Sequence, residues 1–176
     1  LYTLALWAGD KFAENIIYSL DGTPCEKVVG KQFWICPEGV QQEFPRDTML
    51  AELGVTSYAA TPLFSPAGRP LGLLGVMGRK RLRDVAQVES LLKLFSVRTA
   101  AEIERQRTNQ RFADLFEFAP DAIVMTDRAG VIRLVNRQAE EMFGWARTFL
   151  VGQSVEVLLP HEAREQHAGQ IGRAHV

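Results

Sequence analysis

The sequence has little cysteine, little histidine and almost no net charge. Its 176 residues include two Cys and three His, and 20 Lys and Arg side chains are balanced by 21 Asp and Glu. Two cysteines cannot form a disulfide framework, so a reducing cytosol is the expected compartment. A net charge of -1 argues against nucleic-acid binding and against a basic membrane-surface module.

Long apolar runs are also missing. Gly, Pro or charged residues interrupt every apolar stretch well before the roughly 20 residues that a membrane-spanning helix needs. The chain starts at Leu1 without an initiator Met, so the lack of a secretory signal says little about the parent protein. With 47% hydrophobic and 23% charged residues, the composition is that of a globular protein of one or two domains.

The first third of the chain predicts short elements. β-prone residues at 2–7 and 12–18 flank a turn and predict two strands. Thr23 with Glu26 three residues later predicts a capping box that opens a short helix. A short aromatic strand is expected over residues 32–36.

A longer hairpin is predicted next, after a short helix that Asp47 would cap. Residues 57–64 and 70–77 read as its strands, and Pro and Gly stand between them where a tight turn needs them. A phosphate-binding loop would need its glycines between a strand and a helix, followed by Lys and Ser or Thr. Here they lie inside a strand pattern, which favours close backbone approach or a bulge; they are Gly72, Gly75 and Gly78.

Residues 84–118 predict one uninterrupted helix, because apolar positions recur at helical spacing without an internal Gly or Pro. Its middle, residues 102–111, is polar nearly all round, which is typical of a bridge between domains or of a paired helix. We therefore expect a domain boundary near residue 109 and a parallel homodimer through this helix, with a rigid monomeric spacer as the alternative. The expected core positions at near-heptad spacing are Leu91, Phe95, Arg98, Glu102, Arg105, Phe112 and Leu115.

The helix is expected to stop at Pro120, and a second hairpin follows, with strands over 121–126 and 131–135 and Gly130 late in its loop. Asn136 is predicted to cap a short helix that ends at Gly144 in the left-handed conformation. Its apolar face is expected to comprise Ala139, Met142 and Phe143.

These residues resemble two sensor families. Residues 110–170 resemble the N-terminal half of a PAS domain, on the continuous stretch from Phe116 to Gly144 and on Leu150–Gly152. Residues 1–106 resemble the C-terminal part of a GAF domain of the kind that precedes PAS modules in bacterial sensors. That second resemblance is carried by Thr23–Val29, Phe44–Pro45, Ala51–Leu53, Tyr58, Pro62–Leu63 and Gly68–Gly72.

The resemblance implies an α+β fold of two antiparallel-sheet sensor domains joined by a long α-helix. We expect a GAF-like domain at 1–83, truncated at its N-terminal side, and a linker helix at 84–118. A PAS-like domain at 119–170 would be truncated before its last three strands. Residues 171–176 match one reading frame of a common sequencing-library adapter, codon for codon, and we interpret them as read-through.

Cysteine chemistry is not expected. A catalytic thiol needs a His or a charged partner, and the nearest His in sequence, His161, belongs to the other domain. Bilin-binding GAF domains have Cys followed by His, whereas here Pro37 follows Cys36 and Glu26 follows Cys25. Both thiols are therefore interpreted as buried small hydrophobes.

The second domain has no Cys at all, which excludes covalent flavin chemistry and leaves noncovalent flavin open. The spacing from Leu159 and Pro160 to Arg164 and His167 is similar to that before the proximal His of haem-binding PAS domains. His167 is thus a haem-ligand candidate, and a solvated helix histidine is the alternative. No group of Asp, Glu and His has the spacing of metal ligands.

The sequence therefore predicts a non-enzymatic sensory and signal-relay segment of a larger, bacterial, cytosolic protein. An unknown small ligand and a homodimer are the expected partners. The expected output module is a histidine kinase, a cyclic-dinucleotide enzyme or a transcription activator. Two alternatives stay open: a thiol-dependent methionine sulfoxide reductase of the GAF type, and a dimerisation scaffold without a ligand.

Overall fold

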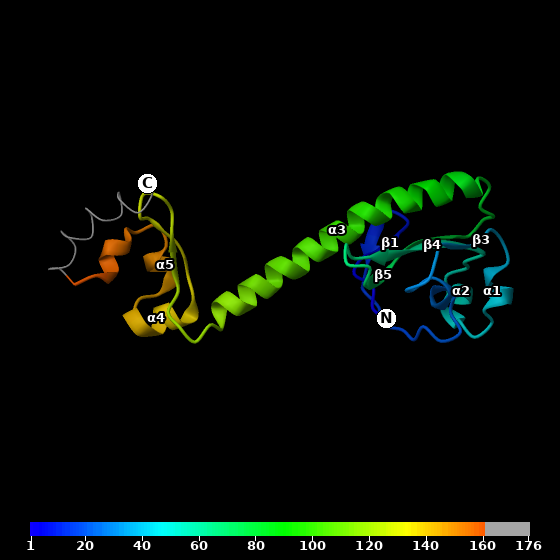
Figure 1. Ribbon diagram of the computed structural model, residues 1–176. Coiled ribbons are helices and arrows are strands. Elements are labelled where there is room, and N and C mark those ends of the chain that lie inside the picture. Colours follow the sequence, from blue (N-terminus) through cyan, green and yellow to red (C-terminus); the bar gives the residue numbers. More distant parts are fainter. Residues whose placement is uncertain (161–176) are drawn as a thin grey trace. The chain divides into compact units, whose positions relative to one another are not determined.

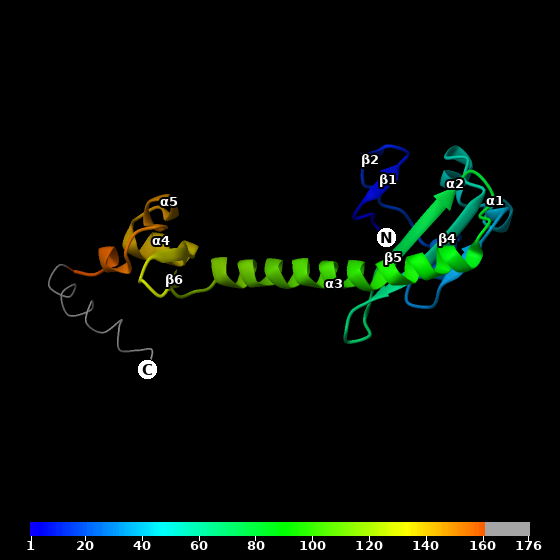
Figure 2. The ribbon, with the colours of Figure 1, turned by 90° about the horizontal axis from the view of Figure 1, so that it is seen from above.

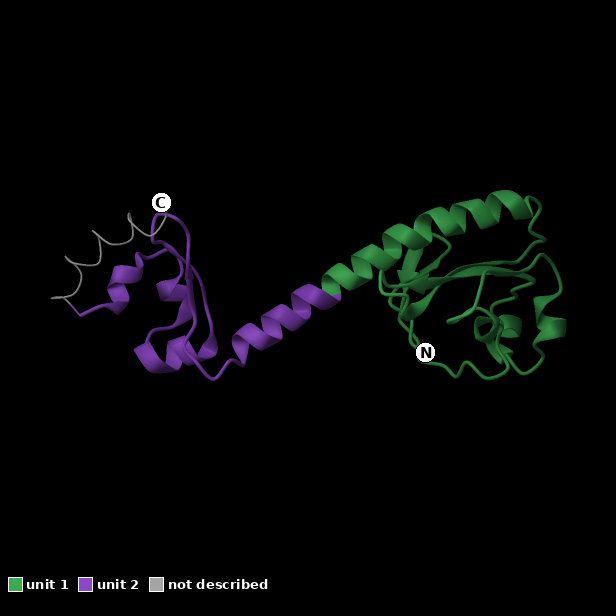
Figure 3. Ribbon diagram, in the orientation of Figure 1, with its two compact units in different colours: residues 1–106 green, residues 107–176 purple. Residues whose placement is uncertain are grey.

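A computed structural model describes residues 1–160 of the chain (Figure 1). The chain divides into two compact units, which we call the first module (Leu1–Gln106) and the second module (Arg107–Val176) (Figure 3). Each contains helices and antiparallel strands, so the predicted α+β class is confirmed. The long helix is confirmed as well: α3 runs over Val85–Glu117 and contributes residues to both modules. Within the described residues, no helix has the length and apolar character to cross a membrane.

An antiparallel sheet of order β3-β4-β5 is the framework of the first module. Strands β4 (Ser57–Phe64) and β5 (Pro70–Gly78) form the long hairpin that the sequence predicted. The short strand β3 (Trp34–Cys36) pairs with the other edge of β4. Because β4 is the central strand, nearly all its side chains are buried, whereas β5 at the edge is largely half-buried or exposed.

Two glycines of β5 let the neighbouring strand approach closely. A Cβ atom at Gly75 would lie 3.0 Å from the Cβ of Ala60, and one at Gly78 would lie 2.6 Å from the Oγ of Ser57. Both glycines lie inside a strand, so they do not form a phosphate-binding loop. The prediction that glycine serves close backbone approach here is confirmed.

The core of the first module lies on one face of this sheet, beneath the segment that carries η1 (Pro24–Lys27), α1 (Val40–Glu43) and α2 (Thr48–Glu52). Its fully buried residues include Val28, Val40 and Leu50. The first half of α3 runs along the opposite face, as Figures 1 and 2 both show. It buries Leu92 and Ala100, whereas its other residues are half-buried or exposed.

The N-terminal strands are much shorter than predicted. Main-chain pairing is confined to β1 (Leu6–Ala8) and β2 (Lys11–Ala13), with an isolated bridge from Tyr2 to Ile17. Side chains interrupt the ladder between them: the Thr3 hydroxyl accepts a bond from the Ile16 N–H (2.8 Å), and the Asn15 side chain donates to the Leu4 carbonyl (3.3 Å). Local side-chain bonds of this kind compete with a strand ladder.

Two predicted helix caps are wrong. Thr23 precedes a short 3₁₀ helix, η1, but its hydroxyl donates back to the Leu20 carbonyl (2.8 Å) and makes no cap bond. Glu26 accepts from the Gly22 N–H (3.3 Å), so its partner is not the one a capping box requires. Asp47 stands before α2 without a side-chain cap bond, at a ψ of 86° that differs from the usual cap geometry.

The second module contains the hairpin of β6 (Val124–Thr126) and β7 (Ile132–Val135). The segment after residue 151 pairs with β7 as well, through the Ile132 N–H to the Gln153 carbonyl and the Gly152 N–H to the Ile132 carbonyl, both at 2.8 Å. The remaining described elements are α4 (Arg137–Phe143), α5 (Arg147–Leu150) and η2 (Val155–Leu158).

The core of the second module is aliphatic and small. Ile132, Ala139 and Leu150 are fully buried, and Val135 nearly so. The predicted apolar face of α4 is only partly right, because Ala139 and Phe143 contact this core whereas the Met142 residue is 63% exposed.

Candidate functional site

The predicted haem ligand, His167, lies outside the described residues, as does the segment 171–176 interpreted as read-through. His161, His167 and His175 are all the histidines of the sequence, and none falls within residues 1–160. In this described part, no three His, Cys, Asp or Glu side chains gather as metal ligands would. The haem hypothesis therefore stays a prediction.

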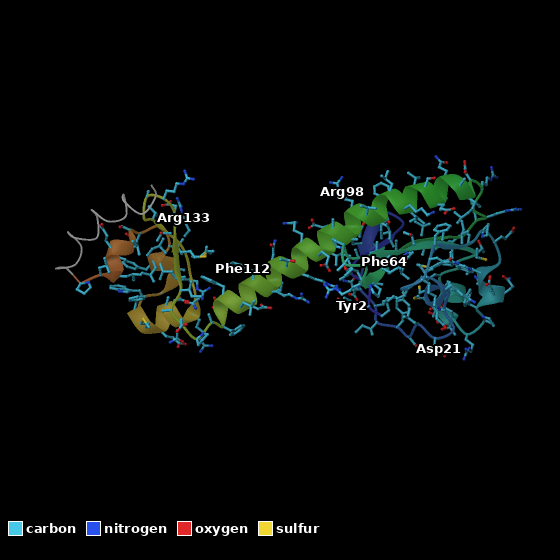
Figure 4. The ribbon with its side chains drawn as sticks, in the orientation of Figure 1. Tyr2, Asp21, Phe64, Arg98, Phe112 and Arg133 are labelled. Atoms are coloured by element: carbon cyan, nitrogen blue, oxygen red, sulfur yellow. The ribbon has the colours of Figure 1, made fainter. Side chains whose placement is uncertain are left out.

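The apolar residues proposed for a helix pair are exposed on α3. Leu91, Phe95 and Leu115 are 46%, 55% and 75% exposed. Figure 4 shows the side chains of Arg98 and Phe112 projecting from this helix. Phe112 and Phe116 stack with ring centroids 6.1 Å apart. The apolar residues thus lie at both ends of α3 and leave its polar middle between them.

The middle of α3 is held by side-chain contacts within the helix. Arg105 donates two hydrogen bonds to Glu102, at 2.8 and 2.9 Å, and Gln106 adds one at 2.9 Å. These bonds, first of all those from Arg105, lower the pKa of the Glu102 carboxyl to about 2. Glu102 therefore stays ionised at any physiological pH, and its pairing with Arg105 needs no second helix.

Asn136 is the polar centre of the second module. It is fully buried, and its Oδ1 accepts bonds from the Ile123 N–H (2.8 Å) and the Ala139 N–H (3.0 Å). Its Nδ2 donates to the Asp121 carbonyl (2.9 Å). One side chain therefore caps α4 and also ties the segment that enters β6 to the start of that helix. The N-cap position was clear from the sequence, whereas the bonds to residues 121 and 123 were not.

Glycine and aspartate shape the hairpin and the helix end around this centre. Gly130 (φ 77°) and Gly144 (φ 71°) adopt left-handed conformations, and the Gly144 N–H donates to the Glu140 carbonyl. Asp127 accepts from the Val131 and Ala129 N–H groups and pairs with Arg133 at 2.6 Å. The Val131 bond, followed by that of Arg133, lowers the pKa of Asp127. Pro120 follows the end of α3 and precedes β6.

The end of α3 is fastened to the rest of the second module by one arginine. Arg147 donates to the Glu117 carboxylate (2.6 Å), and its Nε donates to the Glu140 carboxylate (2.8 Å). Its main-chain N–H bonds Glu140 as well, at 2.6 Å. Arg147 lies at the start of α5, Glu117 is the last residue of α3 and Glu140 belongs to α4, so we call this set the Arg147 junction.

Electrostatics within the Arg147 junction favour the charged forms of Arg147 and Glu140. The Arg147 side chain lowers the pKa of Glu140, and the two carboxylates raise the pKa of Arg147. A guanidinium shared between two carboxylates has a more defined geometry than a single surface pair. Glu117 is 30 residues from Arg147, and no local spacing rule could have revealed this contact.

The two thiols of the first module are buried, as the sequence indicated. Cys25 Sγ lies 3.2 Å from the Tyr58 hydroxyl and 3.3 Å from the Tyr18 hydroxyl, and burial is the main cause that raises the pKa of both tyrosines. Cys36 donates to the Glu38 carbonyl at 3.1 Å, and burial raises its pKa. A raised pKa keeps Cys36 in the thiol form, which is the unreactive one. The tyrosine partners of Cys25 were not anticipated from the sequence.

The second module is similar to known proteins. Residues 110–175 match the model of the PAS fold. The sensor protein FixL of Bradyrhizobium diazoefficiens is 39% identical over 54 residues, which are 31% of this chain and 11% of FixL. Residues 110–175 are therefore similar to a PAS domain, and the two matches support a role in sensory signal transduction.

A solved structure is also similar, the complex of DhaR(N) with DhaL from E. coli. The sequence identity is 21%, and the match covers 66% of this chain and 42% of the solved chain, with a TM-score of 0.33. A score of this size supports no inference about fold or function. The GAF-like assignment of residues 1–106 thus stays a prediction.

Proposed function

We propose that this chain is the sensory and relay segment of a larger cytosolic signalling protein, in which α3 carries conformational change between the two modules and onward to an output module. The match of residues 110–175 to the PAS fold supports a sensory role. The observation that best supports the relay is the Arg147 junction, because its hydrogen bonds attach the end of α3 to α4 and α5 of the second module.

We further propose that α3 pairs with its twin in a parallel homodimer. Its apolar residues at both ends, Leu91, Phe95 and Leu115, are exposed and would be buried by a second helix. The charged residues between them, Glu102 and Arg105, already pair within one helix and add little to such a seam. A weak seam suits a relay, since two packings a few kcal/mol apart respond to small changes in either module.

Sedimentation of the chain at tens of micromolar tests the dimer. Leu91→Lys and Leu115→Lys are each expected to convert the dimer to a monomer, because each introduces a charge at an apolar contact. Gln106→Lys is the matched control, since Gln106 is an exposed residue of the polar middle. A wild-type chain that sediments as a monomer would refute the paired helix and leave α3 as a spacer.

The relay is tested by changing the helical phase of α3. We would join the chain to a histidine kinase catalytic region and delete residues 106–109 or residues 106–107. Four residues are about one helical turn and two are about half a turn. The four-residue deletion is expected to keep autophosphorylation near the undeleted rate, and the two-residue deletion to change it severalfold. Equal rates in all three fusions would refute a relay through α3.

A further inference from the structure

A cavity of about 280 Å³ opens at one end of the first module's sheet. Three segments that are distant in sequence form it: the end of the turn after β3 together with α1, the residue before β4, and the residues that follow β5. Its lining residues are Glu38, Gly39, Gln41, Gln42, Thr56, Arg79, Lys80 and Arg81, and all of these except Gly39 have polar or charged side chains. The functions considered so far use none of these side chains.

The charge of this lining is positive. Arg79, Lys80 and Arg81 contribute three cations and Glu38 contributes the one carboxylate, although the whole chain has a net charge of -1. In the described part of the chain, the one ion pair of these side chains, between Arg81 and Glu38, is long at 3.8 Å and mostly exposed. Within residues 1–160, the Lys80 ammonium has neither a carboxylate nor a hydrogen-bond partner, so its donors are available to a ligand.

The backbone that presents these cations is held in place. The Ser57 hydroxyl donates to the Lys80 carbonyl at 2.7 Å, and the Arg79 Nε donates to the Leu53 carbonyl at 3.0 Å. The opposite wall is also fixed, because the Gln41 amide donates to the Leu50 and Val55 carbonyls at 3.2 and 2.8 Å. The terminal nitrogens of Arg79 remain free of these bonds. A fixed backbone with available cationic ends reduces the ordering cost of binding.

We propose that this cavity binds a small polyanion, of the class of a diphosphate or a phosphate-bearing metabolite. Arginine and lysine are the side chains that most often bind phosphate in proteins. Arginine donates two parallel hydrogen bonds from its planar guanidinium, and lysine offers a compact positive charge. The volume lies just below the roughly 300–1,000 Å³ typical of pockets for drug-sized molecules, which fits a smaller group of pyrophosphate size. The proposal deepens the sensory function by naming a ligand class, and it rests on that function only for the signalling consequence of binding.

Calorimetric titration of the chain with inorganic pyrophosphate tests the site. Lys80→Gln and Arg81→Gln are each expected to weaken binding about three- to tenfold, as expected for the loss of a partly exposed charge contact. Glu38→Gln removes the repelling carboxylate and is expected to tighten binding by a similar factor. A merely structural role of these residues would not produce that gain. A thermal melt of each variant checks that the fold is unchanged.

Arg83→Gln is the matched control, because Arg83 belongs to the same basic run but does not line the cavity. It should change the affinity by less than twofold. An equal loss on Arg83→Gln and Lys80→Gln would show diffuse charge attraction, as a nucleic acid would also experience, and would overturn the site. Absence of binding at millimolar pyrophosphate would overturn it too. Neither result depends on the dimer or on the phase of α3, so the failure of this proposal is distinct from failure of the relay.

Discussion

The two modules are stabilised in different ways. The first is organised by a long hairpin whose strands run over Ser57–Phe64 and Pro70–Gly78, with a core of aromatic, aliphatic and cysteine side chains on one face of the sheet. The second has strands of only three and four residues and a small aliphatic core. Its segments are joined instead by the buried Asn136 side chain and by the Arg147 junction.

This difference indicates where each module is vulnerable. A sheet of tightly packed strands tolerates the loss of a polar contact but not added volume between the strands. A module held by a buried amide tolerates volume changes at its surface but not an unsatisfied main-chain group in its interior. The first module should therefore be sensitive at its glycines and the second at its polar side chains.

The largest effect is expected for Asn136→Ala. This change leaves the Ile123 N–H and the Asp121 carbonyl without their partner and removes the cap of α4. We expect it to destabilise the second module by about 2–4 kcal/mol, the cost of a helix cap together with unsatisfied buried groups. Hydrogen exchange should show the loss of protection in residues 121–159.

Asn109→Ala is the control, because Asn109 is an exposed residue of α3. Its effect should stay within about 0.5 kcal/mol, as for most surface substitutions. Undiminished protection of residues 121–159 in Asn136→Ala would mean that the second module does not depend on this amide.

Gly78→Ala probes the opposite vulnerability, in the first module. The new methyl group would lie 2.6 Å from the Ser57 Oγ, which is buried and bonded to the Lys80 carbonyl. Overpacking of this kind costs about 1–3 kcal/mol, and urea unfolding should report it. In a Ser57→Ala background the same change should cost less, because the clashing oxygen is gone. An equal cost in both backgrounds would place the strain elsewhere.

The pH dependence should separate the modules. In the second module the pKa values of Asp127 and Glu140 are lowered by their hydrogen-bond donors, so their contribution is full above the ordinary carboxyl pKa of about 4 and is lost as the pH falls further. In the first module the pKa values of Tyr18 and Tyr58 are raised by burial, so stability is lost as the pH rises above about 10.

Hydrogen exchange or NMR at pH 3, 7 and 10.5 would resolve the two responses. Loss of the second module first in acid and of the first module first in alkali is the expected pattern. The same order of loss at both extremes would contradict the assignment of these titrations to separate modules.

The smallest effect is expected at the Arg147 junction. Arg147→Gln removes the guanidinium from Glu117 and Glu140 and should speed exchange of the last turn of α3 a few-fold, since partly exposed ion pairs contribute modestly. Arg137→Gln, which removes an exposed pair within α4, is the control and should leave α3 unchanged. Unchanged exchange at the end of α3 in Arg147→Gln would separate this helix end from the second module and weaken the relay proposal.

The elements that depend on neighbours in sequence could be predicted. The hairpin of β4 and β5, the extent of α3, the cap at Asn136 and the left-handed Gly144 all follow from periodicity and turn chemistry, which act over a few residues. The predicted caps of the short helices were wrong, because residue type within a few positions does not decide which partner a polar side chain takes. Thr23 and Asp47 have the residue types of caps, but the Thr23 hydroxyl donates to the Leu20 carbonyl and the Asp47 carboxylate makes no cap bond.

Sequence alone thus determined the fold class, the long helix and the PAS resemblance of the second half, because each depends on the order and spacing of residues close together in the chain. Only the tertiary structure brought Glu117 to Arg147, placed the Tyr58 hydroxyl beside Cys25, and closed a basic cavity from residues 38–42 and 79–81. These contacts join residues far apart in sequence. They form because burying the apolar core fixes the backbone, and that backbone then decides which polar side chains meet.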